Sequence, residues 1–195
     1  MRTRPLRLLM AGLLLASLAA PVAAETPKDT LVMAKVIDDI ISLDPAEVFE
    51  LSGGEMIANL YDRIMMYEPE DTTRLVGGVA ESWNVSDNGR TFTLKIKRGL
   101  RFHSGNPVTA RDAAYSLQRV IKLDKTPAFI LSQLGWTKDN VGDLVRAVDD
   151  ATLQATITKD FAPTFVLNCL SAGVGSVVDM KEVQNHEKDG DLGHA

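Results

Sequence analysis

Few residues have types and spacing that could carry chemistry, and most of them have a structural explanation. His103 and Ser104 are adjacent, and Asp112 follows shortly after. A serine, a histidine and an acid suggest a hydrolase triad, which requires a nucleophile, a base and an orienting acid to converge on one point. However, Ser104 falls in a Gly/Pro turn, and Asp112 is in position to cap the helix that follows. We therefore expect a turn histidine bonded to backbone rather than a catalytic group, and no enzyme.

Metal and phosphate binding are not predicted either. The histidines His103, His186 and His194 lack the short spacing of metal-ligand motifs, and Cys169 has no second cysteine near it. The two Gly-Gly pairs belong to loops and not to a phosphate-cradling motif. The sequence therefore predicts no metal site and no cofactor.

The best candidate for ligand contact is a segment that leads into a predicted helix and comprises Phe49, Glu50, Leu51, Ser52 and Gly53. Ser52 is expected to begin this helix, with Glu55 three residues on in a capping-box arrangement. The free N–H groups and the positive dipole at such a start attract a ligand carboxylate. The segment also has a purely structural explanation as a helix cap, and the two roles are compatible.

The N-terminal residues predict an export signal. Three arginines within the first seven positions form a basic region without acidic residues, and an apolar run over 8–20 follows. Pro21 ends the run, and small residues precede a predicted cleavage after Ala24. The run is shorter than the roughly 20 apolar residues that span a bilayer. We therefore expect residues 1–24 to be a cleaved signal peptide and the rest of the chain to be soluble.

Cysteine content and charge restrict location and partners. The single cysteine, Cys169, lies far from the cleavage site, so no cysteine is available there for a lipid anchor. The apolar residues around Cys169 predict a buried, inert thiol. Removing the signal changes the formal net charge from −5 to −8. This argues against nucleic acid or an anionic membrane surface as a partner.

Apolar periodicity and turn residues predict a mixture of helices and strands. Residues 31–37 are expected to form a buried strand. An alternating hairpin is expected around the turn Asp87-Asn88-Gly89, with Trp83 and Val85 on the buried face of its first strand. Further elements are expected at residues 110–121 (helix), 129–134 (helix), 144–148 (strand), 152–157 (strand), 162–171 (helix), 177–178 (strand) and 180–186 (helix).

The helix after Thr109 is expected to use Thr109 as its cap and Asp112 at the third helical position. Its apolar stripe consists of Ala110, Ala113, Ala114, Leu117, Val120 and Ile121. Arg119 is interpreted as a cation near the helix end that interacts favourably with the macrodipole.

Between Glu81 and Arg119, turn, strand and helix residues follow one another without interruption: Trp83, Ser86-Asp87-Asn88-Gly89, Phe92, Arg98-Gly99-Leu100-Arg101-Phe102-His103, Gly105, Pro107, Ala110, Asp112, Ser116 and Arg119. This pattern resembles the signature of the family 5 extracellular solute-binding proteins, the peptide- and nickel-binding receptors of ABC importers. Ser42-Leu43-Asp44-Pro45 and Asn59-Leu60-Tyr61-Asp62 also resemble the opening of that family.

The resemblance implies an α+β fold that is part of a periplasmic binding protein type II-like two-lobe architecture. It divides the chain into a signal peptide (1–24), the start of lobe one (25–68), an inserted α+β domain (69–174) and the start of the return to lobe one (175–195). Members of the family are usually more than twice this long, so the chain is expected to correspond to an N-terminal portion.

The resemblance further implies a periplasmic component of an ABC importer, binding di- or oligopeptides or a similar small solute. It implies an inner-membrane permease as partner, and we expect a monomer without a membrane anchor. It also places the segment 49–53 near the cleft between the lobes. An alternative stays open, in which the chain is a non-functional remnant or a stand-alone interaction module that binds no solute.

Overall fold

The computed structural model describes residues 26–194, and the predicted signal peptide lies outside them. The chain divides into two units, residues 1–36 and residues 37–195, which are described separately. The predicted strand over 31–37 is wrong, because these residues form irregular backbone. Leu31 is 91% exposed and Val36 is 75% exposed. Apolar β-prone residues form a strand only where another strand supplies the ladder hydrogen bonds.

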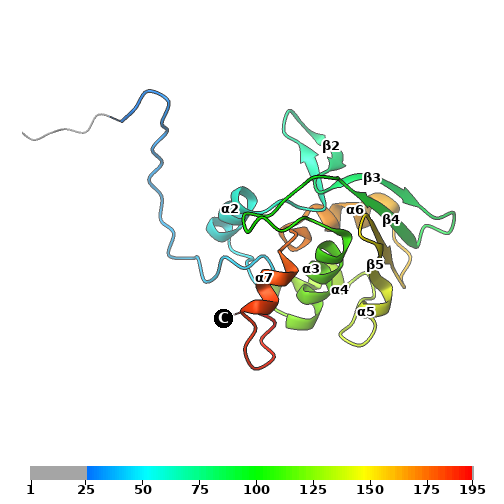
Figure 1. The fold of residues 1–195 in the computed structure, drawn as a ribbon. Helices are drawn as coiled ribbons and strands as arrows, with labels where there is room; N and C mark the ends of the chain where they lie inside the picture. The colour runs from blue at the N-terminus through cyan, green and yellow to red at the C-terminus, as the bar shows by residue number, and fades with distance from the viewer. Residues whose placement is uncertain (1–25, 195) are drawn as a thin grey trace, which may run out of the picture. The chain divides into compact units, whose positions relative to one another are not determined.

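The centre of the second unit is a four-stranded antiparallel sheet with the order β3-β4-β6-β5 (Figure 1). Its strands are β3 (Ala80–Val85), β4 (Thr91–Ile96), β5 (Val145–Asp149) and β6 (Thr152–Thr156). The predicted turn between β3 and β4 is confirmed: Gly89 has a φ of 70°, and its N–H donates to Ser86 O. Glycine adopts this left-handed conformation without steric cost.

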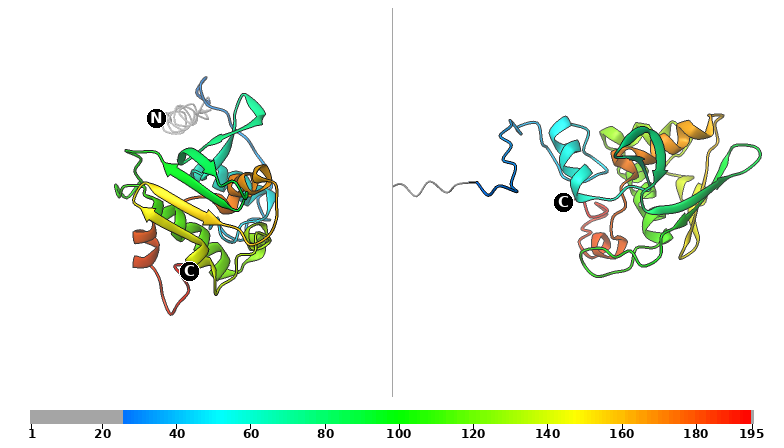
Figure 2. Two further views of the ribbon diagram at one scale, coloured as in Figure 1. Left: turned by 90° about the vertical axis from the view of Figure 1, so that its right-hand side faces the viewer. Right: turned by 90° about the horizontal axis from the view of Figure 1, so that it is seen from above.

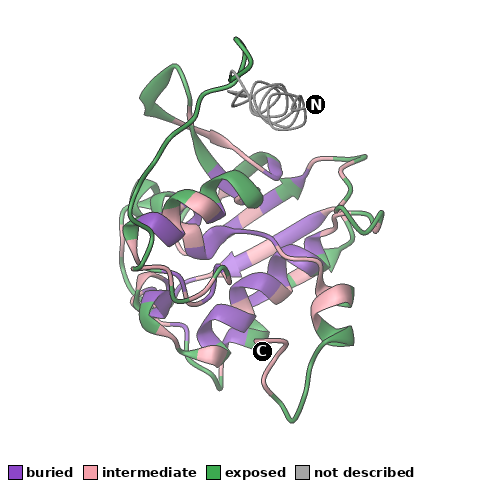
Figure 3. Cartoon of the chain, turned by 90° about the vertical axis from the view of Figure 1, so that its left-hand side faces the viewer, coloured by how far each residue is buried: buried purple, intermediate pink, exposed green. Residues whose placement is uncertain are grey.

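Helix α3 (Ala110–Leu123) contacts β5 and β6, and Figure 2 shows it lying along the sheet. Figure 3 shows that much of this helix is buried. All six residues of the predicted stripe are buried, and so are Phe92, Leu94 and Ile96 on β4. Burial of a large apolar side chain contributes about 1.5–3 kcal/mol, which makes this helix–sheet layer the main source of stability.

The predicted capping of α3 is confirmed, since the Asp112 carboxylate accepts hydrogen bonds from the N–H and the hydroxyl of Thr109. The expected burial of Trp83 is wrong, because this residue is 36% exposed. β3 lies at the edge of the sheet, where it has a hydrogen-bonded neighbour strand, β4, on one side only.

Shorter elements surround this layer. They are α2 (Leu51–Leu60), β1 (Met65–Glu68), β2 (Asp71–Gly77), η1 (Thr126–Ala128), α4 (Phe129–Ser132), α5 (Val141–Leu144), α6 (Pro163–Ser171), η2 (Gly173–Gly175) and α7 (Met180–Asn185). The hairpin β1–β2 was not predicted, and α6 packs against its first strand. The predicted strand over 177–178 is wrong: these residues are irregular, although Val177 N–H donates to Asp62 O.

The thiol of Cys169 is buried, as predicted. Burial raises its pKa, which disfavours the reactive thiolate. Within residues 26–194, no helix has the length and apolar character needed to cross a membrane. The same residues contain no group of three or more potential metal ligands.

Candidate ligand-binding site

The segment Phe49–Gly53, here called the ligand loop, forms the entry into α2. The helix begins at Leu51 with Glu50 as its cap residue, so the predicted start at Ser52 with a capping box is wrong. The Glu50 carboxylate instead accepts a hydrogen bond from the N–H of Phe49 at 3.2 Å. Ser52 is only 5% exposed, and buried packing replaces the predicted capping role.

The helix start already holds a carboxylate of this chain. The N–H of Ser52 donates to Oδ2 of Asp39 at 3.1 Å. A carboxylate at this position is stabilised by the free N–H groups and the positive dipole of the first turn. The N–H of Ser52 is therefore already used by Asp39, and a ligand carboxylate would compete with Asp39 there.

The ligand loop has an exposed part and a packed part. Leu51 is 90% exposed and Phe49 is 54% exposed. The Phe49 ring meets the ring of Phe129 edge to face, with the centroids 5.5 Å apart. Gly53 is packed so closely that a Cβ atom there would lie 2.9 Å from Cγ1 of Val48. Phe49 and Leu51 are therefore the residues of this loop that can contact a ligand, whereas Gly53 fixes the backbone.

A cleft of about 170 Å³ opens beside the ligand loop. Its walls are mainly apolar and include Ile57, Pro127, Ile130 and Val174, together with Phe49 from the loop. Glu50 and Arg63 contribute opposite charges, and the Arg63 guanidinium is held by the carbonyl of Ser171 at 3.1 Å. The volume lies below the roughly 300–1,000 Å³ of sites for drug-sized ligands, so it suits a side chain rather than a whole peptide.

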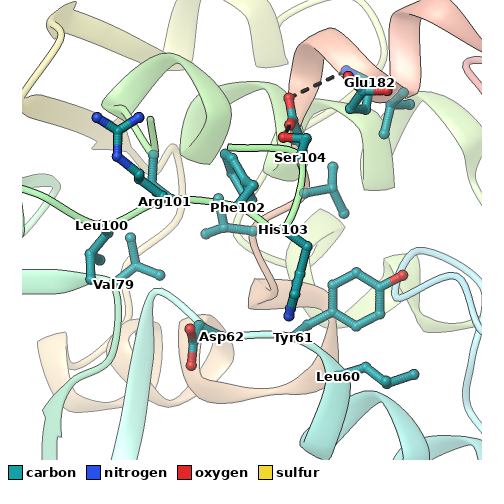
Figure 4. Close-up of a pocket in the computed structure, with 15 residues that line it drawn as sticks. Leu60, Tyr61, Asp62, Val79, Leu100, Arg101, Phe102, His103, Ser104 and Glu182 are labelled. Carbon is teal, nitrogen blue, oxygen red and sulfur yellow. Dashed lines mark hydrogen bonds between the residues drawn. The ribbon is translucent and has the colours of Figure 1, made fainter. Parts of the chain in front are cut away.

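The motif that carries the family resemblance lines a second cavity, of about 320 Å³, which the sequence did not predict. Its walls come from the end of α2, the segment 100–104 and α7 (Figure 4). Leu100, Phe102 and Val79 form part of an apolar wall, and His103 extends toward Tyr61 across the opening (Figure 4). The motif residues line a cavity only because residues 60–62 and 177–183, which are distant in sequence, fold beside them.

The polar groups of this cavity do not form a hydrolase triad. The Ser104 hydroxyl donates to Oδ2 of Asp179 at 2.5 Å, and the amide of Asn106 donates to the same oxygen at 2.9 Å. Burial acts to raise the pKa of Asp179, but these hydrogen bonds, together with those from the N–H groups of Glu182 and Lys181, hold the pKa below its ordinary value. Asp112 caps α3 and also accepts the N–H of Met180. The serine and the acid thus fix turns and helix ends.

Arg119 has a different role from the one predicted. It is 4% exposed and forms a two-pronged ion pair with Asp44, at 2.8 Å to Oδ1 and 2.6 Å to Oδ2. Burial acts to raise the pKa of Asp44, but the hydrogen bonds from Arg119 and from the N–H of Ala46, with the charge of Arg119, lower it overall. The partners are far apart in sequence, so one sequence carries no signal that pairs them.

The sheet, the covering helices and the cleft beside α2 define a mixed α/β scaffold of the kind found in periplasmic peptide-binding proteins. The structure of the Escherichia coli murein tripeptide-binding protein MppA is similar over 77% of this chain, with a TM-score of 0.64 and 27% identity. The Haemophilus influenzae OppA structure, at 23% identity and a TM-score of 0.65 over 74% of the chain, shows the same fold.

The particular family follows from the sequence match. The model of the "Bacterial extracellular solute-binding proteins, family 5 Middle" matches residues 74–193. The chain belongs to the family 5 bacterial extracellular solute-binding proteins, which confirms the predicted resemblance. The structural neighbours support the predicted fold class, part of a two-lobe periplasmic binding protein.

Curated relatives agree with this assignment. The chain is 31% identical over 173 residues to the "Probable D,D-dipeptide-binding periplasmic protein DdpA" of Escherichia coli (strain K12), and the match covers 87% of the chain. It is also 31% identical to the periplasmic murein peptide-binding protein MppA of the same strain, and this match covers 80% of the chain. In both comparisons the chain spans 31% of the relative, or about a third of its length.

Proposed function

We propose that this chain supplies part of the ligand-binding surface of a periplasmic receptor for di- or oligopeptides or a similar small solute. In this proposal the ligand loop contacts the solute through Phe49 and Leu51, while Glu50, Ser52 and Gly53 shape the loop. The receptor delivers its solute to an inner-membrane ABC permease and performs no catalysis. The assignment of residues 25–68 and 175–195 to lobe one, and of 69–174 to an inserted domain, is part of the same proposal.

The observation that carries the proposal is the exposure of apolar loop residues beside an apolar cleft, in a chain that belongs to a solute-binding family. Phe49 and Leu51 are exposed, and Phe49 lines a cleft that has room for a side chain. When a ligand covers water-exposed apolar side chains, the free energy of the complex falls by about 25 cal/mol per Å² of apolar surface buried. Relatives carry names such as D,D-dipeptide-binding and murein peptide-binding protein.

Thermal unfolding with a peptide probe tests this proposal. We expect alanyl-phenylalanyl-alanine to raise the unfolding temperature of the purified chain, because a ligand at 100 times its Kd stabilises the folded state by about 2.7 kcal/mol. Leu51→Ser should reduce this shift without changing the unliganded stability, since Leu51 is 90% exposed. Val148→Ser, at a 51% exposed position on β5, is the matched control.

The alternative of an interaction module or remnant without solute binding makes the opposite prediction. No shift with alanyl-phenylalanyl-alanine, trialanine or a broad panel of di- to pentapeptides at millimolar concentration would favour it. An equal loss of the shift in Leu51→Ser and Val148→Ser would argue against the ligand loop as the contact surface.

Export and processing complete the proposal. We propose that the chain is cleaved after Ala24 and released into the periplasm as a monomer without a lipid anchor. The basic and apolar character of residues 1–20 and the position of the single cysteine support this. N-terminal sequencing of protein recovered from a periplasmic extract should begin at Glu25, and any other first residue would contradict the cleavage site.

A further inference from the structure

Arg119 lies where three segments of the chain meet. Its guanidinium donates to both carboxylate oxygens of Asp44. The same group also donates to the carbonyl of Leu192 at 2.7 Å and to the carbonyl of Gly193 at 3.2 Å. A planar guanidinium can satisfy a carboxylate and two carbonyls together because its five N–H donors point in fixed directions. Arg119 therefore connects α3, the turn after Asp44 and the segment 188–193.

From Asp44 the contacts lead to the ligand loop. The Asp44 carboxylate accepts the N–H of Ala46 at 2.9 Å, and the carbonyl of Asp44 accepts the N–H of Val48 at 3.0 Å. Val48 is buried, and its Cγ1 atom would lie 2.9 Å from a Cβ on Gly53. A displacement of the turn over residues 44–48 would therefore move Val48 against the first turn of α2, where little free space exists.

On the other side, the contacts lead to a folded loop over residues 188–193, here called the tail loop. Leu192 and Gly193 have φ angles of 54° and 67°, in the left-handed region. The Asp191 carboxylate accepts the N–H groups of Lys188 and Gly193, at 2.9 and 2.8 Å. A Cβ on Gly193 would lie 2.6 Å from Cγ1 of Val183 on α7. The carbonyls that face Arg119 are thus held by a defined loop conformation that packs on α7.

We propose that Arg119 is a positioning residue for ligand binding, which holds the ligand loop in place through Asp44 and couples it to the tail loop. This inference rests on the proposed function of the ligand loop. Arg119 itself is buried and contacts no ligand; it acts by keeping Val48, and with it the first turn of α2, in one position. Loss of the guanidinium fork releases the turn over residues 44–48 and the tail loop together.

Arg119→Lys tests this coupling because it keeps the positive charge but removes the planar guanidinium. One ammonium group cannot donate hydrogen bonds to the carboxylate and both carbonyls with the same geometry. Arg111→Lys is the matched control on the same helix, since Arg111 pairs with Asp150 at the surface. Hydrogen exchange of backbone amides and the Kd of alanyl-phenylalanyl-alanine are measured for the wild-type chain and both variants.

In Arg119→Lys we expect amide exchange at Ala46, Val48 and Gly193 to accelerate at least about tenfold more than exchange in β4 and β6, because local opening adds to any loss of global stability. The Kd of the peptide should rise at least about fivefold, within the range of ordinary coupling between sites. Arg111→Lys should change neither measurement.

An equal acceleration of exchange in the sheet and at Ala46 and Val48 would overturn the proposal, because it would assign Arg119 a role in global stability alone. Unchanged exchange at Ala46 and Val48 would overturn it as well, and so would local loosening with an unchanged Kd. If the wild-type chain binds no peptide in the panel, the proposed function fails. The exchange rates at Ala46 and Val48 still decide separately whether Arg119 holds the loop.

Discussion

Replacing Arg119 by methionine should destabilise the chain strongly at neutral pH. Methionine has a similar length but no hydrogen-bond donor, so the substitution removes four hydrogen bonds of 2.6–3.2 Å. The Asp44 side chain, 17% exposed, is left as a buried carboxylate without its cation. Breaking a buried ion pair by removing one partner costs about 3–5 kcal/mol, so we expect a loss of that size at pH 7.

The pH dependence of this loss distinguishes an unpaired charge from lost packing. In the wild-type chain the pKa of Asp44 is lowered, so its contribution to stability is present above the unfolded pKa and is lost as the pH falls through the folded pKa. Without Arg119 the pKa of Asp44 should be higher than in the wild-type chain, because burial still raises it and only the Ala46 N–H and the charge of His194 remain to lower it. The carboxylate of the variant is then protonated at a higher pH than that of the wild-type chain, and the difference between the two proteins should shrink toward pH 4.

Urea denaturation at pH 7 and pH 4 measures this difference directly. Arg111→Met is the control, because its ion pair with Asp150 is exposed and screened by solvent, so its loss should change stability far less. A loss below about 1 kcal/mol for Arg119→Met at pH 7 would refute the reasoning, because it would mean that the carboxylate is solvated in the variant. An equal loss at both pH values would assign the effect to packing and not to the unpaired charge.

Three further substitutions and one chemical modification test the packing. Phe92→Ala should lower the free energy of unfolding by about 3–5 kcal/mol in urea denaturation, because Phe92 is fully buried at the centre of the sheet. An alanine substitution at the exposed Lys95 on the same strand should lower it far less. Gly135→Ala should cost more than about 1 kcal/mol, since Gly135 has a φ of 91° and its Cβ would overlap Oγ1 of Thr158. Gly142→Ala meets open space and should stabilise by about 0.4–1 kcal/mol. A thiol reagent should modify Cys169 at least about tenfold more slowly in the native chain than in denaturant, and equal rates would contradict its burial.

The elements that the sequence predicted well depend on local physical chemistry. The turn at Asp87-Asn88-Gly89 requires a residue that adopts positive φ, and the cap of α3 requires Thr109 and Asp112 three residues apart. The apolar stripe of α3 and the alternation of β4 follow from the helical and strand periods. These features need only neighbours in the chain, so a single sequence contains the information for them.

The incorrect predictions concern features that depend on distant partners. Residues 31–36 have the composition of a strand but, within residues 26–194, no neighbouring strand pairs with them. Trp83 alternates correctly for a buried face, yet β3 lies at the sheet edge, where this side chain is partly exposed. The start of α2 is set by packing of Ser52 and Gly53 and by the carboxylate of Asp39, none of which a capping pattern reveals.

The sequence by itself determined the family, the α+β character and the presence of a helix start within residues 49–53. It did so because motif residues, turns and periodic apolar positions are properties of short stretches. Only the tertiary structure decided which loop residues are exposed, where the clefts lie and that Arg119 is buried against Asp44. The physical reason is that burial and charge pairing arise between segments that meet only when the chain folds, here residues 75 positions apart in sequence.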